Sequence, residues 1–330
     1  MSKFPVRRAF VMMALAAVSS AALAQKSTKP QAPWPTKPLR IMVGFPGGST
    51  PDLVARTIAE PLSKALGQPV IVENRPGAGG NIAADVVAKA KDDHTIGVMI
   101  NGNMTIAKLL NPATPFDPLK DFAPISLIGT APLLLTAPAN APFNNAQEFF
   151  LAARNGGDKW SYGTPGVGTV GHIGMELLKT KTNINAVHVP YPGNPQVINA
   201  MMGGQIQLSL LPPGLAAAQI RAGKLKAVGV TSINRSPLVP EFASLDEGGI
   251  KGFQLEIWTA AAGPASMPKP IVAKLSSLIS EIARTPEVRQ KLFQQGWQVA
   301  GSSSEGLANR IKADTALLGG VIAMRGIKAE

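Results

Sequence analysis

The chain has 330 residues, of which 45% are hydrophobic and 5% aromatic, and its formal net charge is +12 at pH 7. This composition is typical of a soluble globular chain, and the length suffices for two domains with cores of their own. The absence of cysteine excludes disulfides, thiolate catalysis and Cys-ligated metals. The positive charge favours anionic small molecules; nucleic acid is not an expected partner, because the basic residues are dispersed and aromatic residues are few.

Residues 1–24 have the features of a cleaved secretory signal peptide. Lys3, Arg7 and Arg8 precede the uncharged stretch 9–23, and an Ala-Leu-Ala site stands just before Gln25. The uncharged stretch is short for a membrane span, and no stop-transfer pattern follows it. The pattern predicts export to the periplasm; the paired arginines leave both the general secretory route and twin-arginine export open.

Residues 25–38 are polar and rich in proline, which predicts a flexible N-terminal segment. From Leu39 onward, short apolar stretches alternate with helical patterns, which indicates βαβ units and an α/β fold. Pro61 is expected to kink or shorten the first helix. The expected elements are strands at 39–44, 69–73 and 95–101, and helices at 52–66 and 81–91.

A second α/β series follows the apolar stretch 126–136. Its expected helices are at 146–153, 171–180, 196–202 and 215–222, and its strands at 159–163, 186–190, 205–211 and 226–230. The chain then has a strand at 254–263 and helices at 270–283, 286–294 and from Glu305 onward, which have no sheet of their own. We therefore expect the chain to return to the first unit. Lobe 1 is predicted from 39–135 and 256–330 and lobe 2 from 136–255, with crossings near 133–137 and 256–262.

Glycine-rich loops follow several of these strands. In the first, Gly47, Gly48, Ser49 and Thr50 precede a helix, so unpaired backbone N–H groups and the helix dipole make a cradle for an anion. The spacing fits neither a P-loop nor a dinucleotide fingerprint, so nucleotides are not expected. The alternative for each loop is an ordinary strand-to-helix turn that needs glycine.

The stretch 164–172 repeats the same device. Gly166 and Gly168 leave the loop bare, and Thr169 is expected to cap the following helix or to donate a hydrogen bond to a ligand. His172 lies in the first helical turn, where the helix dipole favours a neutral imidazole that donates or caps. If both loops follow the carboxyl ends of strands, they face each other across a cleft and hold a small carboxylate from both sides.

Motifs of catalysis are missing from the sequence. No two histidines stand at i, i+4, and neither H-E-x-x-H nor G-x-S-x-G occurs, so neither a zinc site nor a nucleophile elbow is predicted. His94 is expected in a solvated turn, and His188 in the core or at a strand edge. We predict a binding protein rather than an enzyme, with no cofactor and no metal.

Several longer motifs carry a family resemblance. They are GFPGGS at 44–49, VENRPGAGGN at 72–81, DPLKDFAP at 117–124, YGTPGVGT at 162–169 and VHVPY at 187–191. These stretches resemble the Bug (Bordetella uptake gene) family, the extracytoplasmic solute-binding proteins of tripartite tricarboxylate transporters. The resemblance spans essentially the whole chain after the signal peptide. It implies a two-lobed type II periplasmic binding protein fold (Venus flytrap), in which each lobe is a mainly parallel sheet flanked by helices.

The resemblance also implies a function. A member of this family captures a small carboxylated solute and delivers it to the membrane permease of a tripartite transporter, or in some members to a sensor ectodomain. A periplasmic sensor or co-receptor is therefore the alternative, followed by a periplasmic enzyme on a similar fold; a monomer is expected. The ligand-binding residues carried over by motif are Phe45, Gly47, Gly48, Ser49, Thr50, Asn101, Gly102, Thr164, Gly166, Val167, Gly168, Thr169 and His172.

Departures from the family pattern bear on the ligand. Pro51 stands where the family often has threonine, which removes a hydroxyl and an N–H donor from the first loop. Gln207 and Leu211 stand where many members have acids, and Pro192 stands where a lysine is common. Because an amino acid ligand needs an acid for its ammonium group, we expect a ligand without an amine.

Overall fold

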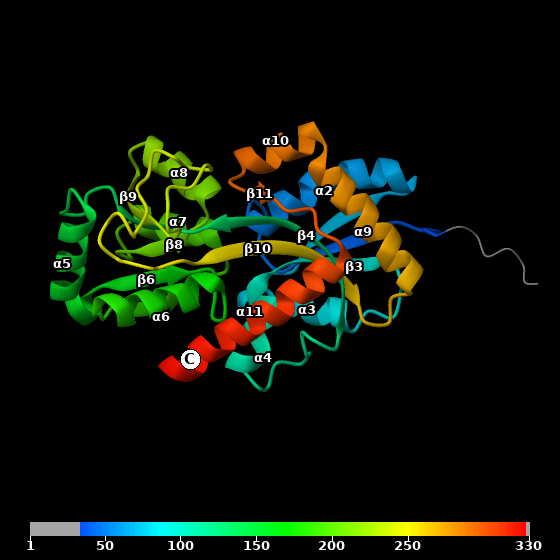
Figure 1. Ribbon diagram of the computed structural model, residues 1–330, viewed down its shortest axis with the longest axis horizontal. Coiled ribbons are helices and arrows are strands. Elements are labelled where there is room, and N and C mark those ends of the chain that lie inside the picture. Colours follow the sequence, from blue (N-terminus) through cyan, green and yellow to red (C-terminus); the bar gives the residue numbers. More distant parts are fainter. Residues whose placement is uncertain (1–33, 328–330) are drawn as a thin grey trace, which may run out of the picture. The chain divides into compact units, whose positions relative to one another are not determined.

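The computed structural model describes residues 34–327, and the chain from Lys37 onward forms one compact unit (Figure 1). The predicted signal peptide at 1–24 and the proline-rich residues 25–33 lie outside the described residues. Within residues 34–327, no helix combines the length and the apolar character that a membrane crossing requires.

A six-stranded sheet, called the first sheet below, organises one half of this unit. Its strand order is β11-β4-β10-β3-β1-β2. The strands are β1 (Leu39–Val43), β2 (Val70–Asn74), β3 (Thr95–Ile100), β4 (Phe122–Pro132), β10 (Glu256–Pro264) and β11 (Gln298–Val299). Strand β1 runs parallel to β2 and β3, whereas β10 is antiparallel to both β3 and β4.

Helices cover both faces of the first sheet. Helices α2, α9 and α10 contact one another, and α11 packs against β4 and α4 (Figure 1). The C-terminal helices thus return to the sheet formed by the N-terminal strands, as the sequence predicts. The bounds are α2 (Thr50–Leu66), η1 (Ala78–Gly80), α3 (Asn81–Ala88), η2 (Gly102–Ile106), α4 (Ala107–Leu110), α9 (Lys269–Arg284), α10 (Pro286–Gln294) and α11 (Ser304–Arg325).

The middle of the chain forms a second group of strands. Strand β5 (Leu134–Pro138) pairs antiparallel with β8 (Ser209–Leu211) and β9 (Leu225–Val230). Strand β6 (Ser161–Thr164) runs parallel to β7 (Val187–Pro190). The flanking helices are α5 (Ala146–Gly156), η3 (Gly157–Lys159), α6 (Val170–Thr182), α7 (Asn194–Met202) and α8 (Pro213–Arg221).

These sheets confirm the predicted α/β class with flanking helices, but the expectation of mainly parallel sheets needs correction. Strands β4 and β10 carry the chain out of the first sheet and back into it, so they run in opposite directions. They pair along their whole lengths, from Glu256 opposite Pro132 to Pro264 opposite Phe122 (Figure 1). A strand that leaves and a strand that returns through the same place must be antiparallel.

Thr231 ties the two crossing segments together. The chain passes from β4 to β5 through Leu133 and reaches β10 through Leu255. The Thr231 hydroxyl donates to the Leu255 carbonyl at 2.7 Å and accepts from the Leu133 N–H at 2.8 Å. The Thr231 backbone also exchanges hydrogen bonds with both residues, donating to the Leu133 carbonyl at 2.8 Å and accepting from the Leu255 N–H at 2.9 Å.

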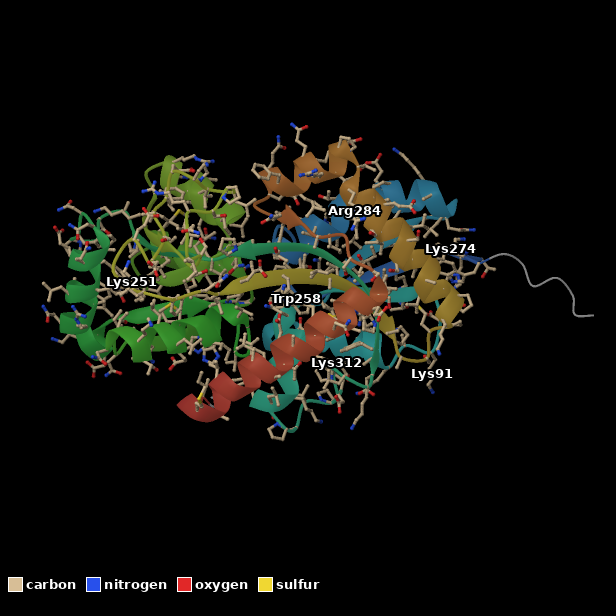
Figure 2. The ribbon with its side chains drawn as sticks, in the orientation of Figure 1. Lys91, Lys251, Trp258, Lys274, Arg284 and Lys312 are labelled. Carbon is tan, nitrogen blue, oxygen red and sulfur yellow. The ribbon has the colours of Figure 1, made fainter. Side chains whose placement is uncertain are left out.

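Trp258 marks the core on the α11 face of the first sheet. Its ring is fully buried, and its Nε1 donates to Asp314 Oδ2 at 2.6 Å, which joins β10 to α11 (Figure 2). Arg310 donates to Asp314 and to Glu256, with Nη2 2.7 Å from Glu256 Oε2. Burial lowers the pKa of Arg310, but the two carboxylates outweigh burial and raise the pKa above its usual value.

Helix α2 continues through Pro61, so the expected shortening is wrong. Its apolar face buries Val54, Ile58 and Leu62 completely. Packing on both sides of the proline therefore outweighs the hydrogen bond that the missing N–H cannot make. The helix ends as predicted at Gly67, whose φ of 67° is the left-handed conformation that glycine adopts freely.

Candidate functional site

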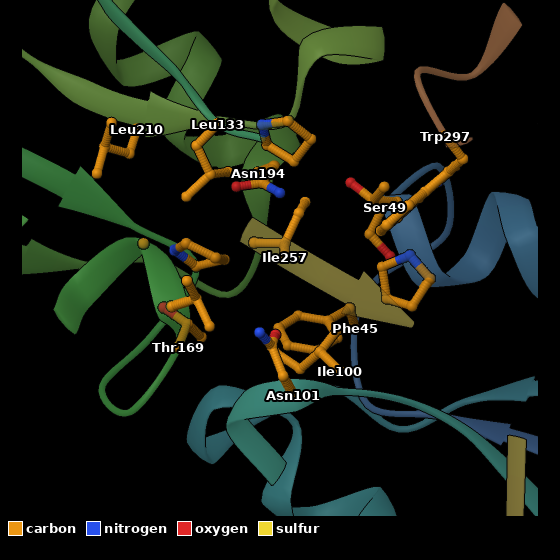
Figure 3. A pocket seen from close by; sticks show the side chains of 16 residues that line it. Phe45, Ser49, Ile100, Asn101, Leu133, Thr169, Asn194, Leu210, Ile257 and Trp297 are labelled. Atoms are coloured by element: carbon orange, nitrogen blue, oxygen red, sulfur yellow. The ribbon is translucent and has the colours of Figure 1, made fainter. Parts of the chain in front are cut away.

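A cavity lies between the first sheet and the second group of strands (Figure 3). The volume that protein atoms leave empty in this cavity is about 510 Å³, which includes the space at its mouth that is open to solvent. The wall is mostly apolar, formed by residues that include Phe45, Ile100, Leu133, Leu210, Ile257 and Trp297.

Five residues predicted for the site line this cavity: Phe45, Ser49, Thr50, Asn101 and Thr169. They come from the β1–α2 loop, the end of β3 and the β6–α6 loop, so the structure brings together segments more than a hundred residues apart. None of the described residues on the wall carries a charge.

The glycines of the first loop lie elsewhere. Gly47 and Gly48 are exposed and outside the cavity wall. The Gly48 N–H, which the sequence offers to a ligand, donates to Asp52 Oδ2 at 2.9 Å. Asn74 Nδ2 donates to Asp52 Oδ1 at 2.9 Å and to the Phe45 carbonyl at 2.9 Å. The chain thus supplies its own carboxylate to this cradle.

Asp52 is the charged anchor of the first loop. Burial raises the pKa of its carboxyl group, but hydrogen bonds from Arg56, Gly48 and Asn74 outweigh burial and hold the pKa below its ordinary value. Its side chain is 2% exposed and pairs with Arg56 at 3.0 Å. The carboxylate therefore fixes the shape of the loop that presents Ser49 and Thr50.

Five residues of the cavity wall carry a buried polar atom that has no hydrogen-bond partner among the described residues. The atoms are Ser49 Oγ, Thr50 Oγ1, Asn101 Oδ1, Asn194 Oδ1 and Trp297 Nε1. Buried polar groups in proteins are nearly always hydrogen-bonded. Their concentration on one wall is typical of a site that receives a polar ligand.

Asn194 and Trp297 are wall residues that the sequence did not single out. Asn194 begins α7 after a loop that follows a strand, so it occupies the same kind of position as Thr50. The rule that ligands bind at loops after the carboxyl ends of strands could have identified it. Trp297 stands between α10 and β11, far from any glycine loop. Nothing in its local sequence marks it, because the contact depends on the return of the C-terminal helices.

Thr169 joins the cavity wall and the N-terminus of α6. Its hydroxyl accepts from the His172 N–H at 3.4 Å, which confirms the predicted cap. The hydroxyl proton goes to the Gly166 carbonyl at 2.8 Å. The expectation that Thr169 donates to a ligand therefore needs correction, since the loop uses that proton internally.

His172 lies behind the wall in a buried stack of rings. Its Nδ1 accepts from the Gly168 N–H at 3.4 Å, which requires an unprotonated Nδ1. The His188 ring stacks on it with 4.4 Å between centroids, and Tyr162 stacks on the other face of His188 at 4.9 Å. Thr164 Oγ1 lies 2.7 Å from His188 Nε2. These two hydrogen bonds tie the stack to Thr164 and Gly168, at the two ends of the β6–α6 loop.

The expectation of a solvated His94 is wrong. His94 is 3% exposed. Its carbonyl accepts from the Arg40 N–H at 2.8 Å, so the residue is drawn into the β1–β3 pairing. The described residues contain no group of three or more His, Cys, Asp or Glu side chains placed to hold a metal ion.

The glycine loops of the two halves touch each other. A Cβ atom on Gly79 would lie 2.5 Å from the Val167 carbonyl oxygen, and one on Gly102 would lie 2.5 Å from the Gly168 oxygen. Such distances are too short for any side chain, so glycine permits backbone-to-backbone contact here. Gly166, Val167 and Gly168 line a second, outer opening beside this contact.

Comparison with known proteins places these features in a family. The chain matches the model of the tripartite tricarboxylate transporter family receptor, TctC, over residues 54–327. It is similar to the solved periplasmic binding protein BugD, with 31% identity over 90% of this chain and 100% of that chain and a TM-score of 0.85.

Two further similar structures contain ligands. MatC from Rhodopseudomonas palustris, solved with bound malate, is 31% identical over 88% of this chain and 100% of that chain, with a TM-score of 0.84. Another R. palustris protein, solved with adipate, is 28% identical over 89% of this chain and 99% of that chain, with a TM-score of 0.86. The chain belongs to the tripartite tricarboxylate transporter receptor family and has the two-lobed fold of its periplasmic binding proteins.

Proposed function

We propose that the protein captures a small carboxylated solute in the cavity between its lobes and delivers it to the membrane permease of a tripartite tricarboxylate-type transporter. The observation that carries this proposal is the group of unpaired polar atoms on an otherwise apolar wall. Ser49 and Thr50 offer hydroxyls, and Trp297 offers an N–H. A carboxylate accepts from donors of this kind, and such charge-assisted bonds are stronger than those to neutral acceptors.

The related structures support a carboxylate as the ligand. Malate and adipate are both small dicarboxylates, and they occupy proteins of the same fold at comparable identity. Malate carries a hydroxyl and adipate does not, so the family alone does not define the rest of the ligand. Phe45, Ser49, Thr50, Asn101 and Thr169 line the cavity, and we propose that they contact the ligand.

The remaining motif residues act in a different way. We propose that Gly166, Val167 and Gly168 close the cavity against the first lobe, where Gly102 faces Gly168. Gly47 and Gly48 keep the Asp52 anchor in place, and Thr164 and His172 support the second loop from behind. The ligand then touches few glycines directly, although the glycines determine the shape of the site.

The predicted export completes the proposal. A signal peptide at residues 1–24 places the mature chain in the periplasm, where a solute-binding protein of this family meets its permease. N-terminal sequencing of the protein recovered from the periplasm tests this step. A mature chain that begins at Gln25 agrees with it, and an intact N-terminus contradicts it.

A thermal-shift screen of carboxylic acids tests the binding function. A ligand that binds only the folded state stabilises it by RT ln(1 + [L]/Kd), about 2.7 kcal/mol at a hundredfold excess over Kd. We expect small carboxylates to raise the melting temperature, and their amides and methyl esters to leave it unchanged. Stabilisation by neutral sugars but by no carboxylate would overturn the proposal.

A further inference from the structure

Asn101 lines the cavity and carries a buried amide oxygen that can only accept a hydrogen bond. Its Nδ2 donates to the Glu256 backbone carbonyl at 3.1 Å. Turning the amide over would set two oxygens against each other, so this bond fixes Oδ1 as the end of the amide that is left to accept a hydrogen bond. Asn101 is 2% exposed, and its Oδ1 has no partner among the described residues. Figure 3 shows the side chain reaching from the end of β3 toward Ile257.

The other polar groups of the wall have different capacities. Trp297 Nε1 can only donate, and the hydroxyls of Ser49 and Thr50 can do either. The Asn194 amide has no hydrogen bond among the described residues, so it can turn either its oxygen or its NH2 group toward a ligand. These groups suit a carboxylate, which only accepts. A carboxylate has no hydrogen to give to Asn101 Oδ1, so a ligand with carboxylates alone leaves this oxygen buried and unpaired, which is costly.

The donor that Asn101 requires is neutral. None of the described residues on the cavity wall is an acid. The nearby carboxylates are already engaged: Asp52 with Arg56, and Glu256 with Arg310 at 2.7 Å. An ammonium group enclosed by the apolar wall would have no counter-charge, and burying an unpaired charge costs far more than burying a paired dipole. A hydroxyl meets the requirement without that cost.

We propose that the cavity selects carboxylates that carry a neutral hydrogen-bond donor, most simply a hydroxyl, on an apolar body, and that Asn101 is the residue that enforces this choice. This inference rests on the proposed function and narrows its ligand class. A site built to bond a ligand hydroxyl discriminates against the analogue that lacks it, because the site's own polar atom is then left unpaired.

Calorimetric titration with matched pairs of acids measures this choice. The pairs are L-malate and succinate, 6-hydroxyhexanoate and hexanoate, and 4-hydroxybenzoate and benzoate. In each pair that binds, we expect the hydroxylated acid to bind roughly ten- to a hundredfold more tightly. L-Aspartate, in which an ammonium group replaces the malate hydroxyl, is expected to bind more weakly than L-malate.

Variants assign the preference to Asn101. Asn101→Ala removes the fixed oxygen and should reduce the hydroxyl preference to less than about threefold. Asn194→Ala is the matched control, because Asn194 lines the same cavity and, within residues 34–327, no hydrogen bond holds its amide. It should weaken both members of a pair alike and preserve their ratio. Asn101→Asp places a negative charge at the same point and should shift the preference from L-malate toward L-aspartate.

The outcomes separate this inference from the function on which it rests. If a pair binds with equal affinity to the natural chain, or if its hydroxyl preference survives Asn101→Ala, the inference fails and the proposed function stands. If Asn101→Ala does not fold, Asn101→Asp provides the test. An unchanged ratio of L-malate affinity to L-aspartate affinity in Asn101→Asp would also overturn the inference. If none of the acids binds, the inference fails together with the proposed carboxylate function.

Discussion

Gly214 touches the Gln295 backbone so closely that a Cβ atom on Gly214 would lie 1.9 Å from the Gln295 carbonyl oxygen. Gly214 lies at the start of α8, and Gln295 follows α10, which packs against α2. The two residues therefore join the second lobe to the first. This contact involves other segments of the chain than the contact of Gly79 with Val167. Neither residue lines the cavity among the described residues.

Gly214→Ala is predicted to weaken ligand binding without touching the ligand. The added methyl group meets rigid backbone, so the lobes cannot reach the same closed arrangement. We expect the dissociation constant of a bound carboxylate to rise at least about tenfold, which corresponds to about 1.4 kcal/mol. Gly320→Ala is the control, since Gly320 is also helical and a Cβ there meets nothing within 4 Å. Equal affinities for both variants would show that this contact does not contribute to closure.

Asp52 makes stability depend on acid pH. Its pKa is lower in the folded chain than the usual value of about 3.9, so its contribution is complete above that value and is lost as the pH falls through the folded pKa. Asp52→Asn should therefore be less stable than the natural chain at pH 7, and the difference should shrink below about pH 4. Chemical denaturation at several pH values measures this. A difference that stays constant down to pH 2 would contradict the role of the charge.

Thr231→Val is predicted to destabilise the connection between the lobes. Valine has the same shape but leaves the Leu133 N–H and the Leu255 carbonyl without their side-chain partner. Each buried polar group left unpaired costs about 1–3 kcal/mol, so we expect the two groups to lower the free energy of unfolding by about 2–6 kcal/mol. Thr180→Val is the control, because the Thr180 hydroxyl bonds the Glu176 carbonyl in an exposed position. A loss no larger than in the control would refute the structural role.

Much of the fold could be predicted because its signals are local. The strand at 39–43 ends before glycine and proline, and the helix that follows ends at Gly67, so both boundaries were predicted to within about two residues. The return of the C-terminal helices also followed, because amphipathic helices without a sheet must cover one. The antiparallel direction of β4 and β10 did not follow, since pairing between distant strands leaves no local pattern.

The candidate site shows the same division. The loops that contain Ser49 and Thr169 were predicted from glycine and helix-start patterns, and both line the cavity. The Gly48 N–H donates to Asp52, four residues later in the chain. This relationship is local, but the sequence analysis considered only the glycines and hydroxyls of the loop and did not predict it. The position of Trp297 depends on packing between α10 and α2, which no local pattern encodes.

Thr169→Val separates capping from ligand contact. The sequence alone predicts a loss of affinity, because a hydroxyl at a loop before a helix can donate to a carboxylate. In the structure that proton goes to the Gly166 carbonyl. We therefore expect a loss of about 1 kcal/mol in the free energy of unfolding, typical of a removed N-cap, and an affinity within about threefold of the natural chain. A tenfold loss of affinity with unchanged stability would restore the prediction from the sequence.

The last prediction concerns motion between the lobes. The chain crosses between them through short segments held at Thr231, while each lobe keeps its own strands, so rotation about these segments changes few contacts within either lobe. Gly79 approaches the Val167 carbonyl, and rotation of the lobes away from each other would break this contact. If the ligand binds both lobes at once, as we propose, it favours the closed arrangement by its difference in affinity for the two states. A permease can then distinguish loaded from empty protein.

Small-angle scattering of the natural chain, with and without a saturating carboxylate, tests this motion. We expect a smaller radius of gyration with ligand. Gly214→Ala should keep the larger radius under both conditions, because its methyl group blocks the approach of α8 to Gln295. If calorimetry confirms binding and the radius is the same in both states, the cleft is already closed without ligand. The permease would then have to recognise a local change at the loops rather than a rotation of the lobes.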